Sequence, residues 1–180
     1  MSLVSQISAP GRAQKVRLVA LVVASLALVV TLAPYAGGMV RAAARSHLHA
    51  PDLALLAAQP LVIKLHIAGA VAALLIGAML MTLRKGVTFH RTAGWLWVGA
   101  MSVVAGSSLF ITGVNGDRWS FIHLITGWVL IALPVAVIAA RRHRVSTHRG
   151  FMMGMFYGGL IIAGALTFIP GRTLWNVFFA

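Results

Sequence analysis

Long apolar runs separated by short, polar and basic segments make up most of the chain. Each run approaches the roughly 20 residues that an α-helix needs to cross a hydrocarbon core of about 30 Å. The pattern therefore predicts an all-α integral membrane protein with five transmembrane helices. The predicted helices cover 18–35, Leu61–Leu83, Ala93–Thr112, Phe121–Ala140 and Phe151–Ile169.

The segments outside these helices are short. Residues 1–17 form a polar N-terminal segment, 36–60 an outer loop, and 171–180 an outer tail with aromatic residues that suit an interfacial anchor. Within the loop, Asp52 predicts the N-cap of a short apolar helix that Pro60 ends. That helix is too short to span, so we expect it at the outer membrane interface.

The second and third helices are repeated by the fourth and fifth. His66 corresponds to His123 near the start of one helix, and His90 corresponds to His148 near the start of the other. Self-similarity of this kind marks a repeated structural unit. Basic pairs stand at matched places between the histidines, namely Arg84-Lys85 and Arg141-Arg142.

Short loops between consecutive helices favour antiparallel packing, so the repeats predict a four-helix membrane bundle. This core covers 61–170, with repeats 61–113 and 119–170.

Composition and charge support a membrane protein and give its orientation. Hydrophobic residues make up 60% of the chain and charged residues only 9%, where a water-soluble domain carries about 25%. Ten of the 15 Lys and Arg residues fall on the side of the N-terminus, which predicts a cytoplasmic N-terminus and a periplasmic C-terminus. Membrane topology and anionic lipid headgroups explain the excess positive charge, so no nucleic-acid partner is expected. The absence of cysteine excludes disulfides and iron–sulfur clusters.

The repeated histidines predict haem ligation. Both repeats begin on the outer side, so a pseudo-two-fold axis along the membrane normal relates them and sets corresponding helices diagonally opposite. His66 then pairs with His123 near the outer face, and His90 pairs with His148 near the inner face. Two axial imidazoles on opposite faces of a flat ring are what a six-coordinate haem requires. We therefore expect one or two haem b groups, with the outer pair as the stronger candidate.

The neighbours of these histidines have suitable chemistry. A planar macrocycle against a helix needs small residues about one turn from its ligand. Such residues lie beside three of the histidines: Ala70, Ala73, Gly77, Gly94 and Gly127. Cations at matching depths are candidate partners for the propionates: Lys64 and Arg118 outside, Arg91 and Arg149 inside.

Other interpretations remain open. A histidine at a helix end also serves to hydrogen-bond a lipid phosphate or a carbonyl, and duplication would copy a structural histidine equally well. The chain then suits a non-catalytic accessory subunit of a larger respiratory or photosynthetic complex. A small-molecule transporter ranks third, because both acids, Asp52 and Asp117, fall in outer loops. No catalytic residue is identified, and whether the chain is an enzyme, such as a transmembrane oxidoreductase, stays open.

Three stretches also carry a resemblance to known proteins. LHIAGAVAALLIGA, KGVTFHRTAGWLWVGAM and RVSTHRGFMM resemble a bacterial family of small polytopic membrane proteins that is defined as a domain of unknown function. The arrangement is more distantly similar to the ascorbate-dependent transmembrane b-type cytochromes, whose four-helix core binds two haems.

The resemblance implies one haem on His66 and His123 and another on His90 and His148. The repeated histidine pairs lead us to expect a haem protein of the bacterial inner membrane that carries electrons in or across the bilayer, with electrons from a quinol, a small reductant or a partner protein.

Overall fold

A computed structural model of the chain describes Ala33 and residues 36–111 and 122–179. These residues are helical apart from short connections and one isolated β-bridge. They divide into two units, Met1–Ser46 and His47–Ala180. The predicted first transmembrane helix lies outside the described residues except for Ala33, and so does Arg118.

In the first unit, residues 36–45 form a helix where the sequence predicts a loop. Gly37 and Gly38 favour a break, but the Ala- and Arg-rich residues that follow have high helix propensity. The Ser46 hydroxyl ends the helix by donating to the Ala42 carbonyl oxygen at 2.6 Å.

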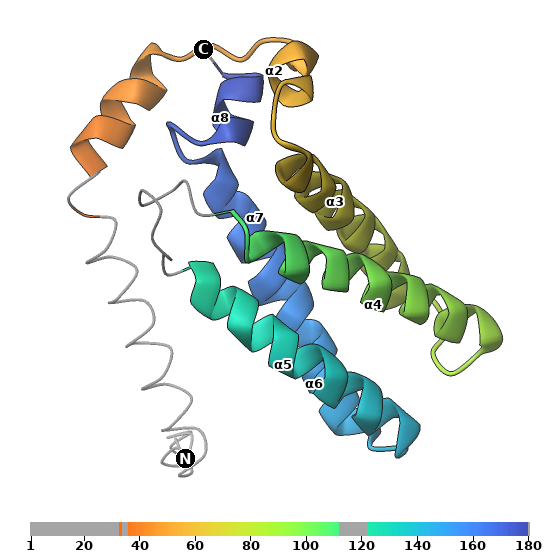
Figure 1. The fold of residues 1–180 in the computed structure, drawn as a ribbon. Helices are drawn as coiled ribbons and strands as arrows, with labels where there is room; N and C mark the ends of the chain where they lie inside the picture. The colour runs from red at the N-terminus through yellow and green to blue at the C-terminus, as the bar shows by residue number, and fades with distance from the viewer. Residues whose placement is uncertain (1–32, 34–35, 112–121, 180) are drawn as a thin grey trace, which may run out of the picture. The chain divides into compact units, whose positions relative to one another are not determined.

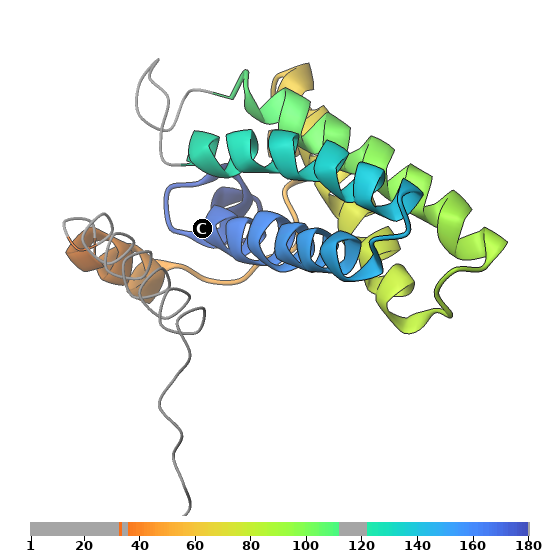
Figure 2. The same cartoon turned by 90° about the horizontal axis from the view of Figure 1, so that it is seen from below.

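The second unit contains four long helices, flanked by two short ones (Figures 1 and 2). The last long helix is continuous, but it changes from α to π and then to 3-10 geometry along its length. In chain order the elements are α2 (Leu53–Ala57), α3 (Leu61–Thr82), α4 (Thr88–Ser108), α5 (Ile122–Arg141), α6 (Val145–Gly154), the π-helix η1 (Met155–Ile162), α7 (Ala163–Ala165), the 3-10 helix η2 (Leu166–Phe168) and α8 (Thr173–Phe178).

Three of the described helices are long and apolar enough to cross a membrane: Leu61–Thr82, His123–Arg141 and Val145–Phe168. The chain is therefore a membrane protein by the length and composition of its helices. The helix α4 is of similar length but falls short in hydropathy, because its first turn contains His90 and Arg91 and it ends with two serines. The sequence predicts five spans, and the described helices establish three candidates.

The outward faces of these helices are as apolar as the interior. Leu75 on α3, Ile131 on α5 and Ile162 on η1 are 65%, 69% and 56% exposed. Water-soluble proteins rarely expose such continuous apolar surface. These side chains fit a lipid environment, in which exposure of an apolar residue carries no hydration cost.

The four long helices form a ring. The helix α3 packs on α4 and η1, and α5 packs on α4, α6 and η1. Since α3 and α5 share the same neighbours, they occupy opposite corners of the bundle, which is the diagonal arrangement that the repeat predicts.

Bulky side chains fill the centre of this ring. Trp97 and Met101 of α4 and Met155 of η1 are at most 2% exposed. The Trp97 indole N–H donates to the Ala73 carbonyl oxygen on α3 at 2.9 Å, so its one polar atom is satisfied inside the core. The interior is thus filled by these side chains, which pack around the hydrogen bond between Trp97 and Ala73.

The short helices close one end of the bundle, which we call the α2 end. Asp52 caps α2, as the sequence predicts, by accepting from the Leu55 N–H at 2.8 Å. The C-terminal tail packs on the segment before α2: Val177 of α8 is buried, and its carbonyl oxygen accepts from the Asp52 N–H at 2.9 Å. The Phe178 carbonyl oxygen accepts likewise from the His49 N–H at 3.0 Å.

At the opposite end, which we call the basic end, a tight turn joins α5 to α6. The Arg144 N–H donates to the Ala139 carbonyl oxygen at 2.8 Å, and the His143 N–H donates to that of Ala140 at 3.1 Å. These two bonds form a Schellman C-cap, in which the residue before Arg144 adopts a left-handed conformation. His143 takes this position with φ of 54°.

We predict that Gly77→Ala destabilises the bundle. A Cβ at Gly77 would stand 2.6 Å from the Phe156 ring and 2.8 Å from the Trp97 indole nitrogen, and both rings are buried. Overpacking of this kind costs about 1–3 kcal/mol. The matched control is Gly99→Ala, where a Cβ meets nothing within 4 Å. Thermal unfolding of both variants in detergent measures the difference, and an unchanged Gly77→Ala melting temperature would contradict the packing.

We also predict that His143→Gly stabilises the protein. A left-handed conformation costs a residue with a Cβ about 1 kcal/mol or slightly more, and glycine escapes this cost. The measurement is the free energy of unfolding in mixed micelles, with Arg142→Gly at the preceding, right-handed turn position as a control expected to lose stability.

Candidate functional site

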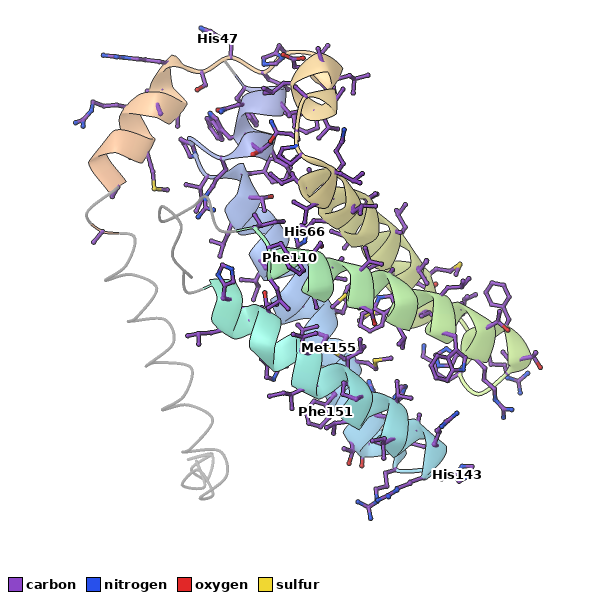
Figure 3. The ribbon with its side chains drawn as sticks, in the orientation of Figure 1. His47, His66, Phe110, His143, Phe151 and Met155 are labelled. Carbon is purple, nitrogen blue, oxygen red and sulfur yellow. The ribbon has the colours of Figure 1, made fainter. Side chains whose placement is uncertain are left out.

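His66 projects from α3 onto α4, on the α2 side of the bundle (Figure 3). Its Nδ1 lies 3.1 Å from the Val104 carbonyl oxygen and 3.1 Å from the Ser107 hydroxyl oxygen. A carbonyl only accepts, and the Ser107 hydroxyl donates its own proton to Val103 at 2.6 Å. Nδ1 therefore carries the imidazole proton, which leaves the lone pair of a neutral ring on Nε2.

His123 lies at the start of α5 and is 9% exposed. One turn later the Thr126 hydroxyl pairs with that of Ser108 on α4 at 2.8 Å, and both residues are buried. His66 thus lies beside the last turn of α4, and His123 lies one turn before the residue that pairs with Ser108 at the end of that helix. The structure brings the predicted outer pair to one end of the bundle.

The predicted inner pair lies at the basic end. The Nδ1 of His148 on α6 is 3.0 Å from the Ala136 carbonyl oxygen on α5, so it too donates, and its Nε2 carries the lone pair. His90, at the start of α4, is close enough to interact electrostatically with His148 and with Lys85. Its Nδ1 is buried and has no hydrogen-bond partner among the described residues.

The small residues beside the histidines have two different environments. A Cβ at Gly94 or Gly127 would meet nothing within 4 Å, so open space lies beside His90 and His123. The space at Gly77 is instead filled by Phe156 and Trp97. The expectation that Gly77 leaves room for a macrocycle is therefore wrong, since the aromatic side chains of two neighbouring helices occupy that room.

The candidate propionate partners are mostly free of contacts. Lys64 donates from Nζ to the Ala57 carbonyl oxygen at 3.1 Å, at the end of α2, where a cation favours the helix terminus. Arg91 and Arg149 are exposed at the basic end, and neither makes a side-chain hydrogen bond or ion pair within the described ranges. Lys64 thus already stabilises a helix end, whereas Arg91 and Arg149 are available.

A groove of about 490 Å³ runs between α3 and α4 next to His66. Its walls are mainly apolar, and its polar groups are two serine hydroxyls. Ser107 both lines the groove and accepts from His66, so it connects the groove to the imidazole. The lining residues are Leu61, Val62, Leu65, Ser102, Val103, Gly106, Ser107 and Phe110.

The sequence interpretation missed the partners that hold the histidines. Ser107, Ser108 and Thr126 form the polar level at the end of α4, together with the Val104 carbonyl. A serine pair at the end of an apolar run, and a threonine three residues after His123, are the signals that point to them. The carbonyl partners carry no sequence signal, because every residue has one.

Comparison with known proteins adds no family or function: no protein-family model, curated protein or solved structure matches the chain.

Within the described ranges no group of three or more metal-binding side chains forms. His47 is exposed, and His49 turns its Nδ1 to the Ala50 carbonyl oxygen at 2.6 Å.

We predict that Ser108→Ala lowers the free energy of unfolding by about 0.5–1.5 kcal/mol. The change removes a buried hydroxyl pair between α4 and α5, and such interhelical bonds in membranes carry energies of this size. Ser102→Ala is the matched control, because the Ser102 hydroxyl is exposed and bonds only within α4. The test is unfolding in mixed micelles, and equal effects of the two changes would contradict the interhelical role.

Proposed function

We propose that the chain is a b-type haem protein that carries electrons in or across the membrane. His66 and His123 are the ligands of one haem, and His90 and His148 those of a second. The observation that carries the proposal is the position of two imidazole Nδ1 atoms, each within hydrogen-bond distance of a backbone carbonyl oxygen, which indicates that Nδ1 is the protonated nitrogen. Each predicted pair contains one histidine whose Nδ1 donates to a carbonyl of a neighbouring helix, Val104 for His66 and Ala136 for His148.

This arrangement is typical of ligating histidines. A metal-bound imidazole almost always donates its other N–H to a carbonyl or carboxylate, which fixes the ring and makes Nε2 a better ligand. A structural histidine within a membrane is equally free to use Nε2 as the donor. That both anchored histidines present Nε2, one at each end of the bundle, favours ligation.

The residues around the histidines provide part of what a haem site needs. Open space beside Gly94 and Gly127 adjoins one histidine of each pair. Haem b, when bound, supplies reversible one-electron chemistry at its iron. The protein holds the imidazoles on separate helices, and Met101 and Met155 exclude water from the layer between the two ends. Arg91 and Arg149, next to His90 and His148 in the sequence, are the candidate cations for propionates at the basic end.

The proposal includes five spans in the bacterial inner membrane, with the N-terminus in the cytoplasm and the C-terminus in the periplasm. Segment 18–35 supplies the first span. The helix α4 crosses despite its lower hydropathy, because its terminal polar residues face other helices: Ser107 bonds His66, and Ser108 bonds Thr126.

The groove beside Ser107 is where electrons enter in this proposal. A quinol has an apolar ring and tail and two hydroxyls, which suits an apolar groove with two serines. A small reductant or a protein partner is the other source.

A second candidate function is that of an accessory subunit in a larger respiratory or photosynthetic complex. It is favoured by the filled centre, where Trp97, Met101 and Met155 leave the bundle closed as it stands. Apolar faces directed outward suit a neighbouring subunit as well as lipid. A transporter has no comparable support.

The haem proposal is tested by the visible spectrum and pyridine haemochrome content of the purified protein. We expect a Soret band, and we expect His66→Ala to remove about one haem equivalent where the wild type holds two. His47→Ala is the control, because His47 is exposed and lies outside the bundle helices. Protein produced with a haem precursor that lacks the band would contradict the proposal.

The accessory role predicts a different result. The protein would co-purify with a larger complex from native membranes in mild detergent, and His66→Ala would leave that assembly intact. Recovery of the chain alone counts against this function.

A further inference from the structure

A small pocket lies at the basic end, where α5 turns into α6. Its volume is about 130 Å³, and it combines two kinds of lining. Two arginines and a threonine supply its polar groups, and aliphatic side chains of α5 supply the apolar ones. The lining residues are Val135, Ile138, Ala139, Arg142, Arg144 and Thr147.

The turn holds the two arginines in fixed backbone positions. The Arg142 N–H donates to the Ile138 carbonyl oxygen at 2.9 Å, and the Arg144 N–H to that of Ala139 at 2.8 Å. His143 stands between them in its left-handed conformation, at the tip of the turn (Figure 3). The backbone at both arginines is therefore fixed before a ligand binds, so binding does not cost backbone entropy in this turn.

The charge at this site is not balanced by the protein. Within the described ranges neither Arg142 nor Arg144 forms an ion pair or a side-chain hydrogen bond, and the described acid, Asp52, lies at the α2 end. The adjacent Arg141 is directed elsewhere, with its guanidinium 5.9 Å from the centre of the Trp95 ring. Two unpaired guanidinium groups beside a hydroxyl are suited to a phosphate, which accepts bidentate bonds from arginine.

The apolar lining of the pocket indicates which kind of molecule carries the phosphate. Val135 and Ile138 are 37% and 49% exposed and continue along α5, one of the helices apolar enough to cross a membrane. An acyl chain that runs down this face stays in contact with apolar side chains while its headgroup remains at the arginines. A free phosphate ion gains nothing from this lining.

We propose that the pocket at the α5–α6 turn binds one anionic phospholipid. Arg142, Arg144 and Thr147 bind its phosphate, and Val135 and Ile138 contact its acyl chain. The proposal does not depend on haem, since it uses none of the four bundle histidines.

The experiment is native mass spectrometry of the full-length protein in detergent, titrated with phosphatidylglycerol and, separately, with phosphatidylcholine. We expect one phosphatidylglycerol to bind more tightly than phosphatidylcholine, and we expect R142Q/R144Q to weaken it about tenfold. The matched control R84Q/K85Q loses the same charge at the same end without touching the pocket, and it should keep wild-type affinity. Inorganic phosphate at the same concentration should not displace the lipid.

Three results would overturn the proposal: equal affinity for the two lipids, equal losses in both double variants, or displacement by inorganic phosphate, which would indicate a site for the free anion. If R142Q/R144Q does not fold, R142K/R144K retains the charge but not the planar guanidinium groups. We expect it to bind phosphatidylglycerol about threefold more weakly. Unchanged affinity in that variant rules out the arginine pocket.

Discussion

The bundle depends on hydrogen bonds that α4 makes with the helices on either side of it. In a lipid environment a polar group finds no water, so it must be satisfied by another helix. The Ala73 carbonyl accepts from Trp97, the Val104 carbonyl accepts from His66, and Ser108 pairs with Thr126. These bonds tie α4 to α3 and α5 at different depths. They also give Trp97, Ser107 and Ser108, three of the polar residues that make α4 less apolar, partners on the neighbouring helices.

Hydrogen bonds between helices also orient two of the histidines. Donation from Nδ1 to a carbonyl leaves only Nε2 available in a neutral ring, and this holds for His66 at one end and His148 at the other. The other member of each pair differs: His123 is buried at the start of α5, whereas His90 has a buried Nδ1 without a partner in the described part of the chain. Corresponding histidines of the two predicted repeats thus lie in different environments.

The basic residues at the basic end have different surroundings in the structure. Arg141 lies over Trp95, Lys85 donates to the Met81 carbonyl at 2.6 Å, and Arg142 and Arg144 flank a pocket. Their gathering at one end is the distribution from which the sequence predicts a cytoplasmic face. This distribution does not explain which of them carry a partner within the protein and which are left to bind an anion.

The helical class, the approximate extent of the described long helices and the cap of α2 at Asp52 were predictable from the sequence, because hydrophobic run length and local capping chemistry are properties of neighbouring residues. Two helix starts were predicted too late: α4 begins at Thr88 instead of Ala93, and the last long helix begins at Val145 instead of Phe151. The sequence also paired the histidines by end, since the repeat fixes their depth. The tertiary structure decided the rest. Gly77 faces Phe156 and Trp97 instead of open space, the C-terminal tail docks on the segment before α2, and the Nδ1 partners of His66 and His148 are backbone carbonyls. Each of these depends on how helices distant in the chain rotate and approach one another, and a carbonyl leaves no trace in the identity of the residue that carries it.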